Sequence, residues 1–220
     1  MVAVEGHGRP KRTGGRPIRL RRESIREEGM LLVVAFALVL LSVPLGGGRL
    51  SALAQLELSA VWLLPAALSV QVLIISVFPD ENSWLLPAAH VFSYGIILVF
   101  LVVNRAHTGL RMVGLGVAMN AAAIAVNGGV MPASDFALTL AGRSGATGEF
   151  MNSAFVGDAK LAFLGDIFAW PDPLPLHNVF SPGDVCILVG AAILLHQVCD
   201  SRFFNAREPS RRRLLPIKPL

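Results

Sequence analysis

Residues 112–129 read MVGLGVAMNAAAIAVNGG, an apolar run without a charged residue that ends in one asparagine and two glycines. Such a run is typical of a helix in hydrocarbon, and the glycines end a helix readily. The uncharged stretch continues to residue 134, and three others, each of 20 residues or more, precede it at 29–48, 58–79 and 82–104. By length, each stretch can cross a bilayer.

The composition of the whole chain agrees with this pattern. Its 220 residues are 54% hydrophobic and 15% charged, with a mean hydropathy of +0.61, whereas a soluble domain carries about 25% charge. A disordered chain, a disulfide scaffold and a nucleic-acid-binding domain are excluded, because the basic residues lie in the two tails and the middle is apolar. We expect an all-α, polytopic integral membrane helix bundle, multi-pass in the cell membrane, with the lipid bilayer as partner and no nucleic acid.

The uncharged stretches and their end signals predict about five transmembrane helices. The last is the weakest by length, but Ser181 can cap it, Pro182 suits its first position and Asp184 falls at its third. A long extracytoplasmic segment, residues 127–181, separates the fourth helix from the fifth. The predicted spans are 30–45, 58–78, 84–103, 112–126 and 182–199.

The ends of the chain are basic. We expect a membrane domain over residues 30–200, a basic cytoplasmic tail over 201–220, and an N-terminal extension over 1–29 that is disordered or a mis-assigned start. If the N-terminus lies outside the cell, nine Lys/Arg residues lie on the cytoplasmic side. Ten Lys/Arg residues then lie outside, once those of residues 1–29 are included. The positive-inside rule then gives no orientation. A translation start at Met30, a signal peptide cleaved after residue 54, or an N-terminus inside each resolves this conflict, and we favour the first.

Polar side chains inside the predicted spans share one depth. Gln71, His90 and Asn120 lie six or seven residues from the outer ends of their helices, which is about 9–11 Å below the outer surface. Tyr94 follows His90 by one helical turn, and Asn127 shares the stripe of Asn120. Gly114, Ala118 and Ala122 form a small-xxx-small series opposite that stripe, which lets another helix approach closely and predicts a central fourth helix.

Three ordered motifs lie in and around the outer segment: NGGVMP at 127–132, FLGD at 163–166 and NVFSPGD at 178–184. Together they resemble an uncharacterised bacterial membrane family, domain of unknown function 5317, over about residues 30–197. The resemblance implies a multi-span membrane protein and supplies no activity or catalytic residue. Residues 1–29 depart from the family pattern, in which the chain begins directly with the first helix.

We expect a noncatalytic membrane component that binds a protein or lipid partner through its outer segment, since no span has a charged residue at its centre. The alternative is a small transporter or ligand-binding membrane protein with a polar pocket for a small molecule in the outer half of the bundle. An enzyme is the least favoured reading: no catalytic motif, cofactor motif or metal-ligand spacing occurs, so we expect no catalytic residue, cofactor or metal. The candidate ligand-binding residues are Gln71, His90, Tyr94, Asn120, Asn127, Asp166, Asn178 and Asp184.

Overall fold

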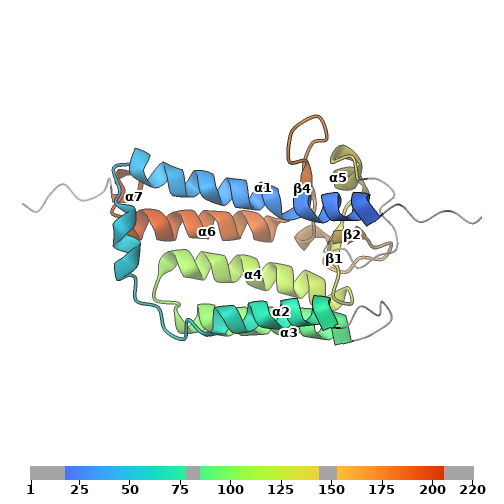
Figure 1. Cartoon of the computed structure of the whole chain (residues 1–220), viewed down its shortest axis with the longest axis horizontal. Helices are drawn as coiled ribbons and strands as arrows, with labels where there is room; N and C mark the ends of the chain where they lie inside the picture. The colour runs from blue at the N-terminus through green and yellow to red at the C-terminus, as the bar shows by residue number, and fades with distance from the viewer. Residues whose placement is uncertain (1–17, 78–84, 144–152, 206–220) are drawn as a thin grey trace, which may run out of the picture.

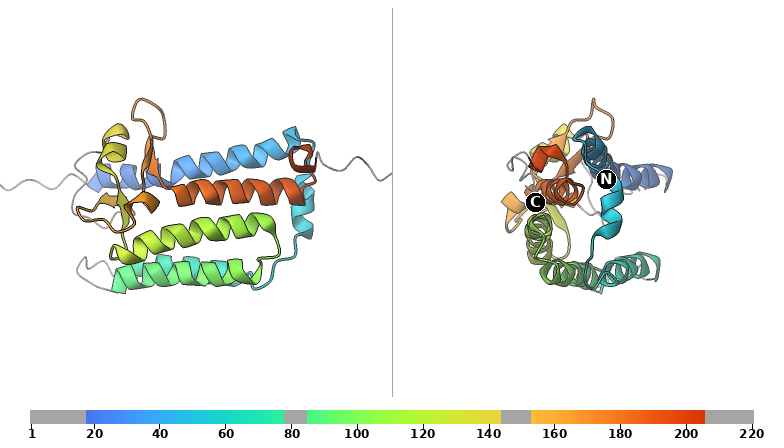
Figure 2. Two further views of the ribbon diagram at one scale, coloured as in Figure 1. Left: turned by 180° about the vertical axis from the view of Figure 1, so that it is seen from behind. Right: turned by 90° about the vertical axis from the view of Figure 1, so that its left-hand side faces the viewer.

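Five long helices form a curved row in the computed structural model, which describes residues 18–77, 85–143 and 153–205. Neighbouring helices pack in the order α1, α6, α4, α3, α2, so that α4 lies in the middle (Figures 1 and 2). The predicted central position of this helix is therefore confirmed. The bounds are α1 Ile18–Leu45, α2 Leu63–Val77, α3 Leu85–Val103, α4 Thr108–Val126 and α6 Pro182–Val198.

The prediction of five transmembrane helices is wrong. Within the described residues, one helix, α4, is long and apolar enough to cross a membrane, and the apolar parts of α1, α3 and α6 each have 10–17 residues. Helix α2 has 15 residues, which extend over about 22 Å against a hydrocarbon core of about 30 Å. Helix α1 begins at Ile18, so that it includes part of the predicted N-terminal extension.

The second predicted span, 58–78, was too long because its uncharged stretch includes a turn. The stretch at 58–79 counts 22 residues, but residues 59–62 form a turn with Ala60 at φ 53° before α2 begins. Helix α1 ends at Leu45, as predicted, before the uncharged Gly46, Gly47 and Gly48. An uncharged stretch therefore shows where a helix lies but does not give the length of that helix.

The predicted outer segment folds into a cap at one end of the row, and this cap corrects the all-α prediction (Figure 1). It contains two small sheets: β1 pairs with β2 in parallel, and β3 pairs with β4 antiparallel. Its own core consists of Ala133, Ala137, Leu138, Ala141 and Val179. The elements are β1 Met131–Ala133, α5 Asp135–Leu140, β2 Ser153–Phe155, η2 Ala162–Leu164, β3 Phe168–Trp170 and β4 Asn178–Phe180. We call the described residues of 127–181 the cap.

Glycines bring α4 and α6 into direct contact. A Cβ atom added to Gly109 would lie 2.6 Å from the carbonyl oxygen of Gly190, and one added to Gly116 would meet the carbonyl oxygen of Gly183. A close approach was expected on the face of α4 that carries Gly114. This prediction is wrong, because a Cβ atom added to Gly114 would lie at an ordinary distance of 3.7 Å from Leu101 of α3. Both faces of α4 carry small residues, and the neighbours decide which one is packed closely.

Two short helices close the opposite end of the row. They are η1 Leu50–Gln55, which follows α1, and α7 Arg202–Asn205, which follows α6. The Arg49 backbone N–H donates to the Cys199 carbonyl oxygen at 2.9 Å, and the Arg202 N–H donates to the Gly46 carbonyl oxygen at 3.0 Å. The ends of α1 and α6 are therefore joined by backbone hydrogen bonds.

Candidate functional site

Helix α6 begins with a capping box at the boundary between the cap and the row. The Ser181 hydroxyl accepts from the Asp184 backbone N–H at 3.0 Å, and the Asp184 carboxylate accepts from the Ser181 N–H at 2.9 Å. Pro182 occupies the first turn. These contacts satisfy backbone donors that the start of a helix leaves free. The predicted start of this helix is confirmed at all three residues.

Asn120 of α4 joins this capping box through its side-chain amide. Its Nδ2 donates to Asp184 Oδ1 at 2.9 Å, and its Oδ1 accepts from the Ser181 hydroxyl at 2.9 Å. The Asn120 and Ser181 side chains are 5% and 0% exposed, so both are satisfied inside the protein rather than by water. The close contact of Gly183 with the Asn120 amide leaves no space for a larger residue at position 183.

A second carboxylate and a phenol lie beside this network. Tyr94 of α3 packs against the buried cluster of Ala123, Ile124 and Met131, which joins α4 to β1. Asp166 is buried, and its backbone N–H donates to the Pro132 carbonyl oxygen at 2.8 Å, which joins it to β1. We call Tyr94, Asn120, Asp166, Ser181 and Asp184 the polar junction, because they lie where α3, α4, α6 and the cap meet.

His90 lies next to the polar junction on α3. Its ring packs edge-on against Tyr94, with ring centroids 5.4 Å apart, as expected for residues one helical turn apart. Gln71 lies in α2, at the edge of the row, and its side chain is outside the part of the chain that the structure describes. Of the residues predicted at one depth, the structure thus brings His90 and Asn120 to the same region.

Asn127 holds a loop of the cap against the end of α4. Its Nδ2 donates to the carbonyl oxygens of Ala123 and Lys160, both at 2.7 Å, and its Oδ1 accepts from the Lys160 backbone N–H at 2.9 Å. A paired contact of this kind recognises backbone in the same way as a neighbouring strand. Asn127 therefore braces the fold, and it also occupies the C-cap of α4.

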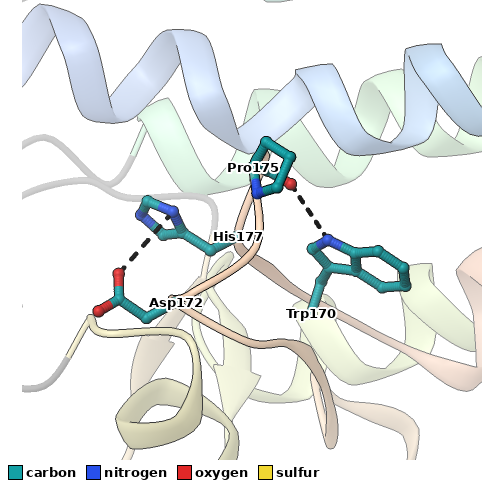
Figure 3. A network of polar contacts seen from close by, with 4 residues as sticks. All are labelled: Trp170, Asp172, Pro175 and His177. Carbon is teal, nitrogen blue, oxygen red and sulfur yellow. Dashed lines mark hydrogen bonds and ion pairs between the residues drawn. The ribbon is translucent and has the colours of Figure 1, made fainter.

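Asn178 braces the hairpin of β3 and β4. Its Oδ1 accepts from Arg143 Nη1 and from the Val179 N–H, both at 2.9 Å. The connection between the two strands is a proline-rich loop that projects from the cap (Figures 1 and 3).

Contacts within the projecting loop give it a defined shape. Trp170 Nε1 donates to the Pro175 carbonyl oxygen at 3.1 Å, and His177 Nδ1 lies 3.9 Å from the Asp172 carboxylate (Figure 3). Leu176 has a left-handed backbone with φ 65°, a strained conformation for a residue with a side chain. The loop holds this conformation, which indicates that surrounding contacts compensate its cost.

The polar junction is rich in hydrogen-bonding groups that are directed at one another. Asn120, Ser181 and Asp184 form one network, and Asn127 and Asn178 contact backbone. Within the described residues, no group of three His, Cys, Asp or Glu side chains could hold a metal ion. This arrangement indicates that these residues hold the cap against the helices. A small-molecule pocket among the candidate residues stays a prediction.

Sequence reasoning missed the partners of these residues. It selected Asn120 and Asp184 separately, whereas Ser181 and Asn120 lie 61 positions apart and bond directly. It also missed Asn104, whose side chain clamps the Ser59 backbone at 2.8 and 2.9 Å. Asn104 stands directly after the last apolar residue of α3, as Asn127 does after α4. An asparagine directly after the last apolar residue of a helix could therefore have predicted a contact of this kind.

We expect Asn127→Ala to loosen the Lys160 loop while the rest of the protein stays folded. The variant loses three side-chain hydrogen bonds, each with a net value of about 1 kcal/mol, so backbone amides near residue 160 should exchange at least about tenfold faster. Hydrogen exchange measured by mass spectrometry checks this.

Asn104→Ala is the matched control at the other end of the row. It should accelerate exchange near Ser59 and leave the amides near Lys160 protected. If Asn127→Ala leaves exchange around Lys160 unchanged, the bracing role of Asn127 is refuted.

Comparison with known proteins identifies the family of the chain. No curated protein and no solved structure is significantly similar to the chain. A family model matches residues 55–196, a range that contains all three motifs of the predicted resemblance. The chain therefore belongs to a family of unknown function, DUF5317.

Proposed function

We propose that the protein is a noncatalytic component of the cell membrane that binds a partner protein through its cap. The proposal rests foremost on the outward faces of the helices, which carry large apolar side chains. The most exposed include Val33, Leu38 and Leu41 of α1, Leu68 of α2 and Phe92 of α3, each at least 61% exposed. Large apolar side chains gathered on an exposed surface mark contact with lipid or protein.

The cap adds exposed aromatic residues on a braced framework. Phe136 and Phe163 are 73% and 65% exposed, while Ala137 and Leu138, next to Phe136 in α5, are buried in the core of the cap. Phe155, Phe168 and Trp170 are also exposed. Large, rigid aromatic side chains contribute most of the binding energy in many protein interfaces, because little conformational entropy is lost when they bind.

Charge favours a protein over anionic lipid as the partner of the cap. Asp135, Asp158 and Asp172 are exposed there, and carboxylates repel the negative surface of phospholipid head groups. Aromatic residues beside carboxylates suit instead a protein surface with apolar pockets and basic residues at the rim.

Photo-crosslinking in native cells tests the proposal. Benzoylphenylalanine in place of Phe136 or Phe163 should give one protein adduct, identified by mass spectrometry, whereas the same replacement at Phe92 should give lipid adducts. The chain itself should resist alkaline carbonate extraction and require detergent for release.

Two results would contradict the proposal in different ways. Release by carbonate without detergent removes membrane residence. Lipid adducts at Phe136 and Phe163, as at Phe92, leave the membrane component intact but replace the partner protein with lipid. As a specificity control, Phe163→Ala should reduce the protein adduct formed from position 136 by at least about tenfold, as truncation of a central aromatic residue does.

A further inference from the structure

The two ends of the row differ in charge. In the described residues from 30 onward, the end opposite the cap carries Arg49, Arg105, Arg111 and Arg202 with the acidic Glu57 and Asp200. The polar junction and cap carry five aspartates, with Arg143 and Lys160 as the basic residues. The start of α1 also lies at the cap end (Figure 1), where residues 18–29 add four arginines and three glutamates. The two ends therefore differ in net charge, and not because the cap end has fewer basic residues.

The fold gathers the four arginines of the end opposite the cap from distant segments. Arg49 follows α1, Arg105 lies between α3 and α4, Arg111 lies in the first turns of α4, and Arg202 begins α7. All four residues are exposed. Figure 2, right, views the molecule from this end, where η1 and α7 lie in front of the long helices. We call these residues the arginine end.

Local contacts position two of the guanidinium groups. Arg202 lies over Gly47, since a Cβ atom added to that glycine would be 3.5 Å from Arg202 Nε, and Arg49 follows two residues later. Arg111 Nη2 donates to Thr108 Oγ1 at 3.0 Å. The guanidinium group is planar and offers several donors at once, which suits phosphate oxygens.

Exposed apolar side chains surround the same end. Leu45 and Trp62 are 82% and 68% exposed, and Phe203 and Val102 are also exposed. Arginine beside exposed Trp and aliphatic residues at the ends of apolar helices is the arrangement that meets a membrane interface, with the rings at head-group depth and the cations at the phosphates.

We propose that the arginine end binds the phosphate groups of anionic phospholipids. This inference rests on the proposed function, because it requires the helices to lie in a membrane. Charge complementarity selects anionic lipid, and continuity with the exposed apolar faces of the helices places the acyl chains against them.

Native mass spectrometry of the full chain tests the lipid preference. Phosphatidylglycerol and phosphatidylcholine with identical acyl chains are titrated separately against the purified protein. We expect phosphatidylglycerol to bind more tightly, and replacement of each arginine by glutamine to weaken that binding about fivefold, which corresponds to about 1 kcal/mol per basic residue at an anionic surface. The preference should also fall at high salt.

Three variants make the result specific. The quadruple Arg→Gln variant should bind both lipids equally, the quadruple Arg→Lys variant should keep most of the preference, and Lys160→Gln, at the cap end, should keep all of it. The basic residues after position 205 are unchanged in every variant, so a difference comes from the arginine end itself.

Several outcomes would overturn the inference. Equal binding of the two lipids by the unchanged chain, or a preference retained by the quadruple Arg→Gln variant, refutes a phospholipid site at the arginine end. Displacement of phosphatidylglycerol by inorganic phosphate alone assigns the surface to free anions instead. A chain that binds neither lipid and stays in solution without detergent refutes the proposed function as well, so the two failures are distinguishable.

Discussion

Replacing Gly116 with alanine should lower the free energy of unfolding by about 2 kcal/mol. The added methyl group would meet the Gly183 carbonyl oxygen and would lie 2.8 Å from Ile187 Cγ1 and 2.9 Å from the Ile187 backbone nitrogen. Two of these three atoms belong to the α6 backbone, so α4 and α6 must separate to make space. Overpacking of a closely packed interface costs about 1–3 kcal/mol.

The matched control is Gly95→Ala in α3, where an added Cβ atom meets nothing within 4 Å. Alanine is the better helix former by about 1 kcal/mol at both positions, so Gly95→Ala should leave stability unchanged or raise it. The difference between the two variants therefore isolates the α4–α6 contact. Equilibrium unfolding in mixed detergent micelles measures both, and equal stability of the two variants would contradict close glycine packing.

The same interface shows how much of the fold could be predicted from the sequence. Uncharged stretches and end signals located all five long helices, because the start and stop of a helix are encoded within a few neighbouring residues. The capping box of Ser181 and Asp184 was predictable for the same reason. Helix length was not predictable: α1 begins at Ile18, within the charged residues before the predicted start at 30, and the uncharged residues 59–62 form a turn before α2 begins.

Features that depend on distant partners were out of reach. Strands β1 and β2 have three residues each and pair residues 131–133 with 153–155, too short a run to show alternation. The choice between the two small-residue faces of α4 depends on where α3 and α6 pack. The candidate list still contained Asn120, Tyr94, Asp166 and Asp184, because buried polar groups are rare in apolar helices and their neighbours, and rarity is visible in a sequence.

The second large effect is expected at the polar junction, from Asn120→Asp. In the unchanged protein the Asn120 amide donates to Asp184 Oδ1, and the substitution replaces that donor with a second carboxylate in a buried position. Two carboxylates at this separation repel each other and leave oxygens without a donor, so we expect a loss of about 2–3 kcal/mol at neutral pH.

Acid should reverse much of this loss. When one of the two carboxyl groups binds a proton, it becomes a hydrogen-bond donor to the other, so the folded variant takes up a proton more readily than its unfolded chain. Stability gained in this way is present in acid and is lost as pH rises. Unfolding measured at pH 5 and pH 8 should therefore differ for Asn120→Asp by more than for the unchanged protein.

Exchanging Asn120 and Asp184 shows whether the loss of stability comes from this pair or from a general loss of packing. In the double variant Asn120→Asp with Asp184→Asn, the amide and the carboxylate trade places, and one donor again faces one acceptor across α4 and α6. The double variant should regain most of the stability at pH 8 and lose the added pH dependence, apart from about 0.3–1 kcal/mol for moving the negative charge away from the start of α6. A double variant no more stable than Asn120→Asp alone would show that Asn120 and Asp184 do not stabilise the interface as a pair.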